Sequence, residues 1–478
     1  MRKKLKSSNL HKLITSPFGK LLNTPLFEWV KIRSINQEFK LTQISAVARA
    51  THYQGVDAFL EQLKLRNKLE SRVRDKLARA LAAFGQEWQQ CQTIIEEWET
   101  AFWQNSVPKR APNTLVDMEI ARRRRTERCL KPSRHFAFLV RDKRVAAIKF
   151  KIPAPAKVLA RWSGEINDPD QLYRLPSNLP SVESSQQILG PAGPEYLLRF
   201  PSPSPYLPGR AYARVYEPEQ PAGHVPTLIY GSGLGVMNDQ VTYWPEEEYI
   251  GRKLAAQGCR VILLESPWHG RREQPGFCSG EPYLAGAPES LFRLFATQAQ
   301  DTAVLVQWAR STGAAIVGVG GVSLSGLVAQ QVATHCQLWP AELRPDMIFL
   351  AASSNNICQV ALESRLVQAL GADRAGLEAG WDENTLNVIR PLLDPGPTLG
   401  LPADQIVAVL GRLDTIIPYK FSKKMLQSWQ VPQENIITWD VGHCGLLTRA
   451  IHSSELQELI LRTLRRLHPP RSEPQICP

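Results

Sequence analysis

The chain has 478 residues, of which 43% are hydrophobic and 21% are charged. This length and composition exclude a mini-protein and a wholly disordered protein, because the chain can bury a large apolar core. No stretch approaches the roughly 20 apolar residues of a membrane-spanning helix, and the start MRKKLK lacks the apolar run of a secretory signal. The eight cysteines show no metal-site or disulfide spacing. We therefore expect a cytoplasmic protein, with a peripheral position at a membrane surface as an open alternative.

The net charge of +12 is concentrated in the first part of the chain. Residues 1–200 hold 35 Lys and Arg against 19 Asp and Glu, whereas residues 201–478 hold 22 against 26. Such a split is typical of an enzyme body joined to a segment attracted to phosphates, in lipid headgroups or nucleic acid. Nucleic acid is the less favoured of these two partners but stays open.

Residues 1–50 are predicted to form a basic N-terminal arm of short helical pieces, interrupted by Pro17, Gly19 and Pro25. An apolar stripe beside Lys12 and Lys20 could lie on an anionic membrane surface. Docking on the protein's own body is the favoured alternative, because amphipathic stripes more often face a core. The stripe comprises Leu10, Leu13, Ile14, Phe18, Leu21 and Leu22.

Residues 51–150 are predicted to be largely helical. Apolar side chains recur at helical spacing over residues 56–103, as one long helix or two helices broken near Gly85. Four arginines at 122–125 form the densest positive charge, either a grip for phosphates and acidic partners or, preferably, a solvated helix face. Apolar residues alternate on both sides of the polar segment 141–144, which predicts a β-hairpin over 136–150.

A proline-rich linker over residues 151–190 is expected to cross the surface and deliver the chain to a second unit, 191–478. Two short strands are expected there, at 196–200 and 211–216. Apolar runs then alternate with amphipathic helices, which predicts an α/β domain with a mostly parallel sheet. The segment 353–402 is too long for a plain connection and is the expected cap over a site. The predicted strands are 225–230, 260–264, 315–319, 347–352 and 405–410, and the helices are 245–257, 289–310, 325–338 and 418–429.

The strongest chemical signal is the sequence GGVSLSG at 320–326, which follows a predicted strand and leads into a helix. A serine at a sharp strand-to-helix turn needs small neighbours, here Gly321 and Ser325. The helix start also offers backbone N–H groups to a developing oxyanion. Ser323 is therefore a candidate nucleophile, which requires a base and an orienting acid.

Two loops after later strands supply candidates for these partners. Asp414 follows the strand 405–410, and His443 follows an apparent strand at 436–439. The carboxyl ends of parallel strands share one edge of a sheet, so these side chains can converge on Ser323. Asp404 and Asp440 are rival acids, but the first precedes its strand and the second would need a tight local turn.

The chain order Ser, Asp, His resembles that of the α/β-hydrolase superfamily of serine esterases, lipases and thioesterases. The segment ESPWHGR at 265–271 is similar to the family loop D-x-P-G-H-G-x-S, and GSGLG at 231–235 is similar to its H-G-x-G oxyanion loop. The resemblance covers about residues 190–478. It implies an α/β-hydrolase fold with a helical cap insertion, preceded here by a basic, largely helical N-terminal extension.

The resemblance also implies roles for individual residues. Ser323 would be the nucleophile, His443 the general base and then the general acid, and Asp414 the group that orients the imidazole. The N–H groups of Ser232 and Leu324 would form the oxyanion hole. His269 would brace loops and Cys444 would pack. Arg271 and Arg272 either bind a carboxylate or phosphate of the substrate or, preferably, form surface salt bridges.

These assignments predict a serine hydrolase that cleaves an ester or thioester of a small-molecule or lipid acyl substrate through an acyl-enzyme. No cofactor or metal is implied, and acyl transfer to an acceptor other than water stays open. The alternative is an inactive hydrolase-fold protein that binds a membrane or nucleic acid through its basic N-terminal region.

Overall fold

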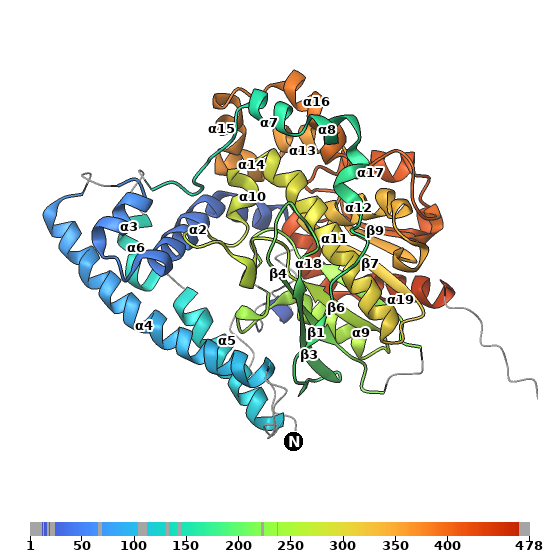
Figure 1. Cartoon of the computed structure of the whole chain (residues 1–478), viewed down its shortest axis with the longest axis horizontal. Helices are drawn as coiled ribbons and strands as arrows, with labels where there is room; N and C mark the ends of the chain where they lie inside the picture. The colour runs from blue at the N-terminus through green and yellow to red at the C-terminus, as the bar shows by residue number, and fades with distance from the viewer. Residues whose placement is uncertain are drawn as a thin grey trace, which may run out of the picture.

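The structure is a computed structural model that describes residues 12, 14–16, 19, 24–65, 69–103, 112–130, 133–140, 145–220, 224–236 and 238–467. A twisted sheet runs through the centre of the molecule (Figure 1). Strands from β6 to β10 are parallel, and β3 and β4 join them in antiparallel pairs. The spatial order is β1 (Glu183–Ser184), β3 (Pro194–Pro201), β4 (Arg210–Tyr216), β6 (Arg260–Leu264), β5 (Thr227–Gly231), β7 (Val317–Val322), β8 (Met347–Ala351), β9 (Ile406–Gly411) and β10 (Ile436–Trp439), with β2 (Ile188–Leu189) paired to β3.

Both faces of the parallel part are covered, which explains why its strands are apolar runs. Along β5, Ile229 belongs to the core on one face, whereas Leu228 and Tyr230 belong to the core on the other. The first face carries α11 (Glu289–Ser311) and α12 (Leu324–His335), and the second carries α9 (Lys253–Ala255), α18 (His443–His452) and α19 (Glu455–Leu467). The predicted fold class is thereby confirmed. Strands β6 and β10 have their predicted bounds, and β7 begins two residues later than expected.

Four helices occupy the insertion between β8 and β9: α13 (Ile357–Glu363), α14 (Arg365–Leu370), α15 (Ala372–Glu378) and α16 (Glu383–Leu393). The proline-rich segment contributes α7 (Pro155–Arg161) and α8 (Ser163–Asn167), which lie beside these helices at the top of the molecule (Figure 1). The indole N–H of Trp381 donates to the carbonyl of Pro153 at 2.8 Å. The segment is therefore packed against the helical cap.

The N-terminal extension is built mainly from α2 (Pro25–Thr51), α3 (Val56–Gln62), α4 (Ser71–Trp103) and α5 (Pro112–Leu130). Instead of short pieces, residues 25–51 form one helix, capped by Thr24 and packed against α14 and α18. Of the apolar stripe, only Ile14 is described; it is buried, and its carbonyl oxygen lies 2.7 Å from His452 Nε2. The described part thus docks on the protein's own body. Helix α4 continues without a break through Gly85. The predicted helical region is divided instead between the end of α3 at Gln62 and the start of α4 at Ser71.

The predicted β-hairpin over 136–150 is wrong. Residues 133–140 form helix α6, the described residues 145–150 contain no strand, and 141–144 lie outside the described residues. Phe136 and Leu139, three positions apart, are both buried, and the Phe136 ring stacks on Phe59 with 5.7 Å between centroids. Packing against α3 and α4 therefore selects the helical period over the alternation, which the same residues also allow.

Arg122 and Arg123 are buried, so they neither form a solvated helix face nor are accessible to a phosphate. They belong to an ionic cluster, defined here as five arginines and five carboxylates that are almost completely buried between α5 and the sheet. Arg123 donates to both oxygens of Glu247 at 2.8 Å, and Arg214 donates to Glu119 and Glu195 at 2.9 Å each. The cluster comprises Glu119, Arg122, Arg123, Glu195, Arg214, Asp239, Glu247, Arg252, Glu265 and Arg271.

Candidate active site

Ser323 lies at a sharp turn between the end of β7 and the start of α12. Its φ of 54° and ψ of −117° are backbone angles that residues other than glycine rarely adopt. The turn brings the strand against the helix, because a Cβ added at Gly321 would lie 2.5 Å from Ser325 Cβ. The small residue at 321 therefore lets the backbone present Ser323 at the carboxyl edge of the sheet.

His443 and Asp414 lie beside this turn, as the sequence predicted. His443 Nε2 is 3.0 Å from Ser323 Oγ, and His443 Nδ1 is 2.8 Å from Asp414 Oδ2. The other Asp414 oxygen accepts from the N–H groups of Ile416 and Ile417 at 2.9 and 2.8 Å, which fixes the carboxylate. Hydroxyl, imidazole and carboxylate thus form one hydrogen-bonded series, the arrangement that activates a serine.

The rival acids point elsewhere. Asp440 is 79% exposed and pairs with Arg412 at 2.7 Å, and Asp404 pairs with Arg466 at 3.5 Å near the opposite end of its strand. Three features identify the architecture. The sheet is parallel except for its first strands, a serine lies at a strained strand-to-helix turn, and an Asp and a His follow later strands. The chain has the α/β-hydrolase fold. The N-terminal helices α2 to α6 are an extension of this fold.

Comparisons with known proteins find similar solved structures but no match to the sequence. Neither a protein-family model nor a curated protein matches the sequence. Among solved structures, acetyl xylan esterase 1 from Thermoanaerobacterium is 16% identical, with a TM-score of 0.46, over 67% of this chain and 97% of that one. An esterase from the archaeon Pyrobaculum calidifontis is 15% identical, with a TM-score of 0.35, over 66% and 93%. Pyrococcus horikoshii acylaminoacyl peptidase is 11% identical, with a TM-score of 0.40, over 62% and 50%.

The predicted oxyanion loop leaves the sheet beside the serine turn, because Gly231 of β5 is in register with Gly321 of β7. Ser325 Oγ donates to the Ser232 carbonyl at 2.6 Å, and a Cβ at Gly231 would lie only 2.4 Å from that hydroxyl. Glycine at 231 is therefore required for this contact. Leu324 is the first residue of α12, so its N–H has no acceptor within the helix. Both segments that were predicted to supply oxyanion donors thus border Ser323.

His269 is buried and braces two loops. Its Nε2 accepts from the N–H of Gly235 at 3.1 Å, and its Nδ1 lies 2.8 Å from the Pro267 carbonyl. Burial lowers the pKa of His269 to about 4, so the ring is neutral near pH 7. Burial also raises the pKa of the Cys444 thiol to about 11, which leaves it protonated and a poor nucleophile.

Arg271 and Arg272 are committed to the protein's own carboxylates. Arg271 bonds to both oxygens of Asp239 at 2.9 Å and also pairs with Glu265. Arg272 donates to Asp301 at 2.8 Å. Neither guanidinium lines the cavity beside Ser323, so the structure does not bring them to that serine. The preferred salt-bridge interpretation holds, although the pairs are buried rather than at the surface.

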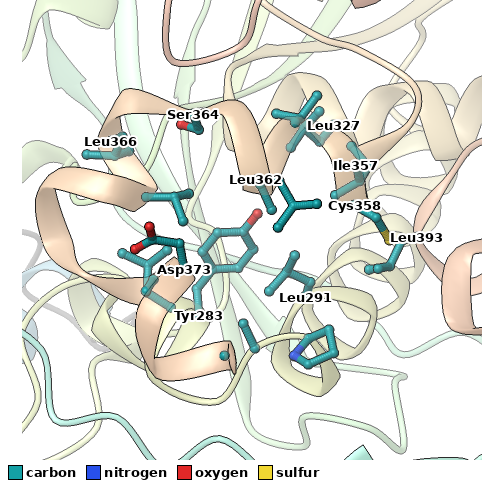
Figure 2. A pocket seen from close by; sticks show the side chains of 18 of the residues that line it. Tyr283, Leu291, Leu327, Ile357, Cys358, Leu362, Ser364, Leu366, Asp373 and Leu393 are labelled. Carbon is teal, nitrogen blue, oxygen red and sulfur yellow. The ribbon is translucent and has the colours of Figure 1, made fainter. Parts of the chain in front are cut away.

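An apolar pocket extends from Ser323 and Leu324 under the cap helices. Its empty volume is about 1160 Å³, part of which is open to solvent. Figure 2 shows the Tyr283 ring among aliphatic side chains from α11, α12 and the cap. Asp373 is the single ionisable carboxylate among its described lining residues, which include Leu291, Leu327, Ile357, Leu362, Leu366 and Leu393.

Two negative findings apply to the described part of the chain. No three His, Cys, Asp or Glu side chains gather there in a group that could hold a metal ion. No helix there is both long and apolar enough to cross a bilayer.

One residue beside the site was missed by the sequence analysis. Glu28 of α2 is buried against the loop that carries Asp414. Its signal in the sequence is faint, because it is one of only two acidic residues among the first 50. No local pattern connects it with a loop 387 positions further along the chain.

Proposed function

We propose that the chain is a serine hydrolase that cleaves an ester or thioester with an apolar acyl group. The observation that carries the proposal is the hydrogen-bonded series Ser323, His443 and Asp414 at the wall of an apolar pocket. His443 takes the hydroxyl proton as Ser323 Oγ attacks the acyl carbon, and Asp414 stabilises the imidazolium that results. The N–H groups of Leu324 and Ser232 would hold the developing oxyanion.

The second half of the reaction uses the same residues. The imidazolium of His443 donates its proton to the departing alcohol or thiol, and a covalent ester remains on Ser323. Water then attacks that ester with His443 again as base, which releases the acid and restores the serine. Transfer to another hydroxyl or thiol in place of water would follow the same path.

The pocket favours a neutral, aliphatic acyl chain. Burial of methylene groups among its leucines would be favourable by about 0.8 kcal/mol each. Asp373 would repel an acyl chain that ends in a carboxylate or phosphate, and Arg271 and Arg272 are paired with other groups. We therefore propose a small-molecule or lipid ester as the substrate. An interaction of residues 1–50 with an anionic membrane stays a prediction.

Labelling with a fluorophosphonate probe tests the proposal, because the probe reacts with activated serines. We expect labelling of the wild type, none of Ser323→Ala, and a loss of about 10³-fold or more in rate for His443→Ala. The exposed Ser428→Ala is the matched control and should label normally. A folded wild type that does not label would contradict the proposal and favour the binding-protein alternative.

The bond type needs a separate measurement. Turnover of p-nitrophenyl alkanoates is compared with that of the matching p-nitroanilides. Ester cleavage that increases with chain length supports the proposed substrate class. A preference for the anilides would instead assign the chain to peptide or amide cleavage, the activity named for one of the matched structures.

A further inference from the structure

We propose that Glu28, carried by the N-terminal helix α2, is a positioning residue of the active site that holds the Asp414 loop and acts on His443 through space. The inference rests on the catalytic role proposed for His443. It assigns a part of the hydrolase site to the N-terminal extension, outside the α/β-hydrolase domain.

The first contact is with the residue that follows Asp414. Glu28 lies in the first turn of α2 and is only 5% exposed. Its Oε1 accepts from Thr415 Oγ1 at 3.0 Å and from Thr415 N–H at 3.3 Å. Asp414 itself is bonded to the next two N–H groups and to His443. The loop is therefore held from inside by Asp414 and from outside by Glu28.

The second contact is with the residue that precedes His443. The other Glu28 oxygen is buried without a hydrogen-bond partner and lies against the backbone of Gly442, where an added Cβ would be 1.6 Å from it. Leaving a buried oxygen without a partner is costly, so its position needs an explanation. A negative charge directed at the loop of His443 provides one.

The charged groups around Glu28 make its effect on His443 directional. Burial and the Asp414 carboxylate raise the pKa of Glu28, whereas His443 and Thr415 lower it. At His443, burial disfavours the charged ring, but Asp414 and Glu28 outweigh burial and raise the pKa of His443. Lys31 and Glu38 of α2 also face this region, and they pair with each other at 3.0 Å. Glu28 therefore acts with Asp414 to stabilise the imidazolium.

Helix α2 has other anchors that do not depend on Glu28. Asn36 donates to the Ala369 carbonyl of α14 at 3.2 Å, Gln43 donates to the Gly276 carbonyl, and Arg49 pairs with Glu273 at 2.9 Å. The helix thus spans the acid loop, the cap and the loop after β6. Because these contacts remain, Glu28→Gln is expected to leave α2 in place.

The direct test is the pKa of His443, measured by NMR of labelled histidines in the full chain and assigned with His443→Asn. We expect Glu28→Gln to lower it by about 0.5–1 unit, because one of two neighbouring anions is lost. Glu28→Asp should restore part of the shift, and Glu61→Gln, at an exposed glutamate of α3, should change nothing. An unchanged value in Glu28→Gln would overturn the inference. Thr415→Val, which removes one hydrogen bond to Glu28, gives a second variant should Glu28→Gln fail to fold.

The pH profile of p-nitrophenyl ester hydrolysis gives a functional readout. The neutral form of His443 is the base, so kcat/KM rises as pH rises through its pKa. A lowered pKa therefore moves the acid limb of Glu28→Gln to lower pH by the same amount. A wild type that fluorophosphonate does not label, with the NMR shift intact, refutes the proposed function alone. Normal labelling with an unmoved limb and an unmoved NMR value refutes the role of Glu28 alone.

Discussion

The ionic cluster and the apolar pocket are both buried, yet they are built from opposite materials. In the cluster, five arginines face five carboxylates, and hydrogen bonds between them join α5 to β4 and to Glu247. In the pocket, aliphatic side chains from the cap and from α11 and α12 surround one carboxylate. Directional charged contacts specify a single arrangement, whereas apolar contact accepts any chain of suitable size. The contrast separates a cluster that holds elements of the fold together from a pocket that is proposed to bind substrate.

Equal numbers of opposite charges leave the cluster with no net charge, which is what makes its burial tolerable. Moving ions out of water is costly, and the mutual attraction repays the cost only when every partner is present. Removal of one partner should therefore cost far more than removal of one pocket side chain. Three experiments follow from this difference.

The largest expected effect is on stability in Arg123→Met. This change leaves Glu247 buried without its bidentate partner and should lower the free energy of unfolding by about 3–5 kcal/mol. Urea unfolding measures the loss. Arg124→Met, the exposed neighbour in the same run, is the matched control and should change stability by less than about 0.5 kcal/mol. Equal losses in both variants would show that the cluster does not fix the extension.

A smaller effect, on activity, is expected for Leu366→Asp in the pocket. A second carboxylate beside the acyl chain should lower kcat/KM for a long-chain p-nitrophenyl ester by about 100-fold, while acetyl ester hydrolysis changes little. The assay is the ratio of long-chain to acetyl turnover. Val388→Asp on α16, half-exposed and outside the pocket lining, should leave the ratio unchanged. Parallel loss for both esters would contradict the acyl assignment.

The smallest expected effect is on the acid dependence of stability. Burial would raise the pKa of Glu119, but Arg122, Arg123 and Arg214 lower it to about 2. The group thus contributes stability above its ordinary value of 4.5, and the contribution is lost as the pH falls toward about 2. Urea unfolding at several pH values between these two gives the free energy of unfolding as a function of pH. In Glu119→Gln, the slope of this free energy against pH should be smaller than in the wild type by up to the contribution of one proton. An unchanged slope would mean that Glu119 does not remain ionised.

The sheet could be predicted because its strands are covered on both faces and therefore stand out as apolar runs. Strands β6 and β10 have the predicted bounds for this reason. Helix α6 could not be predicted, because the spacing of its phenylalanines suits either a strand or a helix. The contact of Phe136 with Phe59 and Phe84 decides between them. The local sequence pattern predicts an element that is buried on both faces. It is ambiguous where contact with one neighbouring element decides between strand and helix.

The three side chains at the serine turn could be predicted because parallel strands bring their carboxyl ends to one edge. The burial of Arg122 and Arg123 could not be predicted. Their partners Asp239 and Glu247 lie more than 100 positions away, and no local pattern distinguishes a buried arginine from a solvated one. Glu28 was missed for the same reason. Long-range electrostatic pairing has no sequence period.

The contact between Glu28 and Thr415 joins residues 387 positions apart, and His443 lies further still along the chain. The ribosome makes α2 before Ser323 and makes His443 after it, so Ser323 emerges before the imidazole that is proposed to activate it. Loop closure over such a separation is among the slow steps of folding. A chain that ends after residue 417 but before residue 443 would carry the serine turn and the pocket-lining residues without the imidazole. Under the proposed function, hydrolytic competence would therefore arise only after His443 has been synthesised.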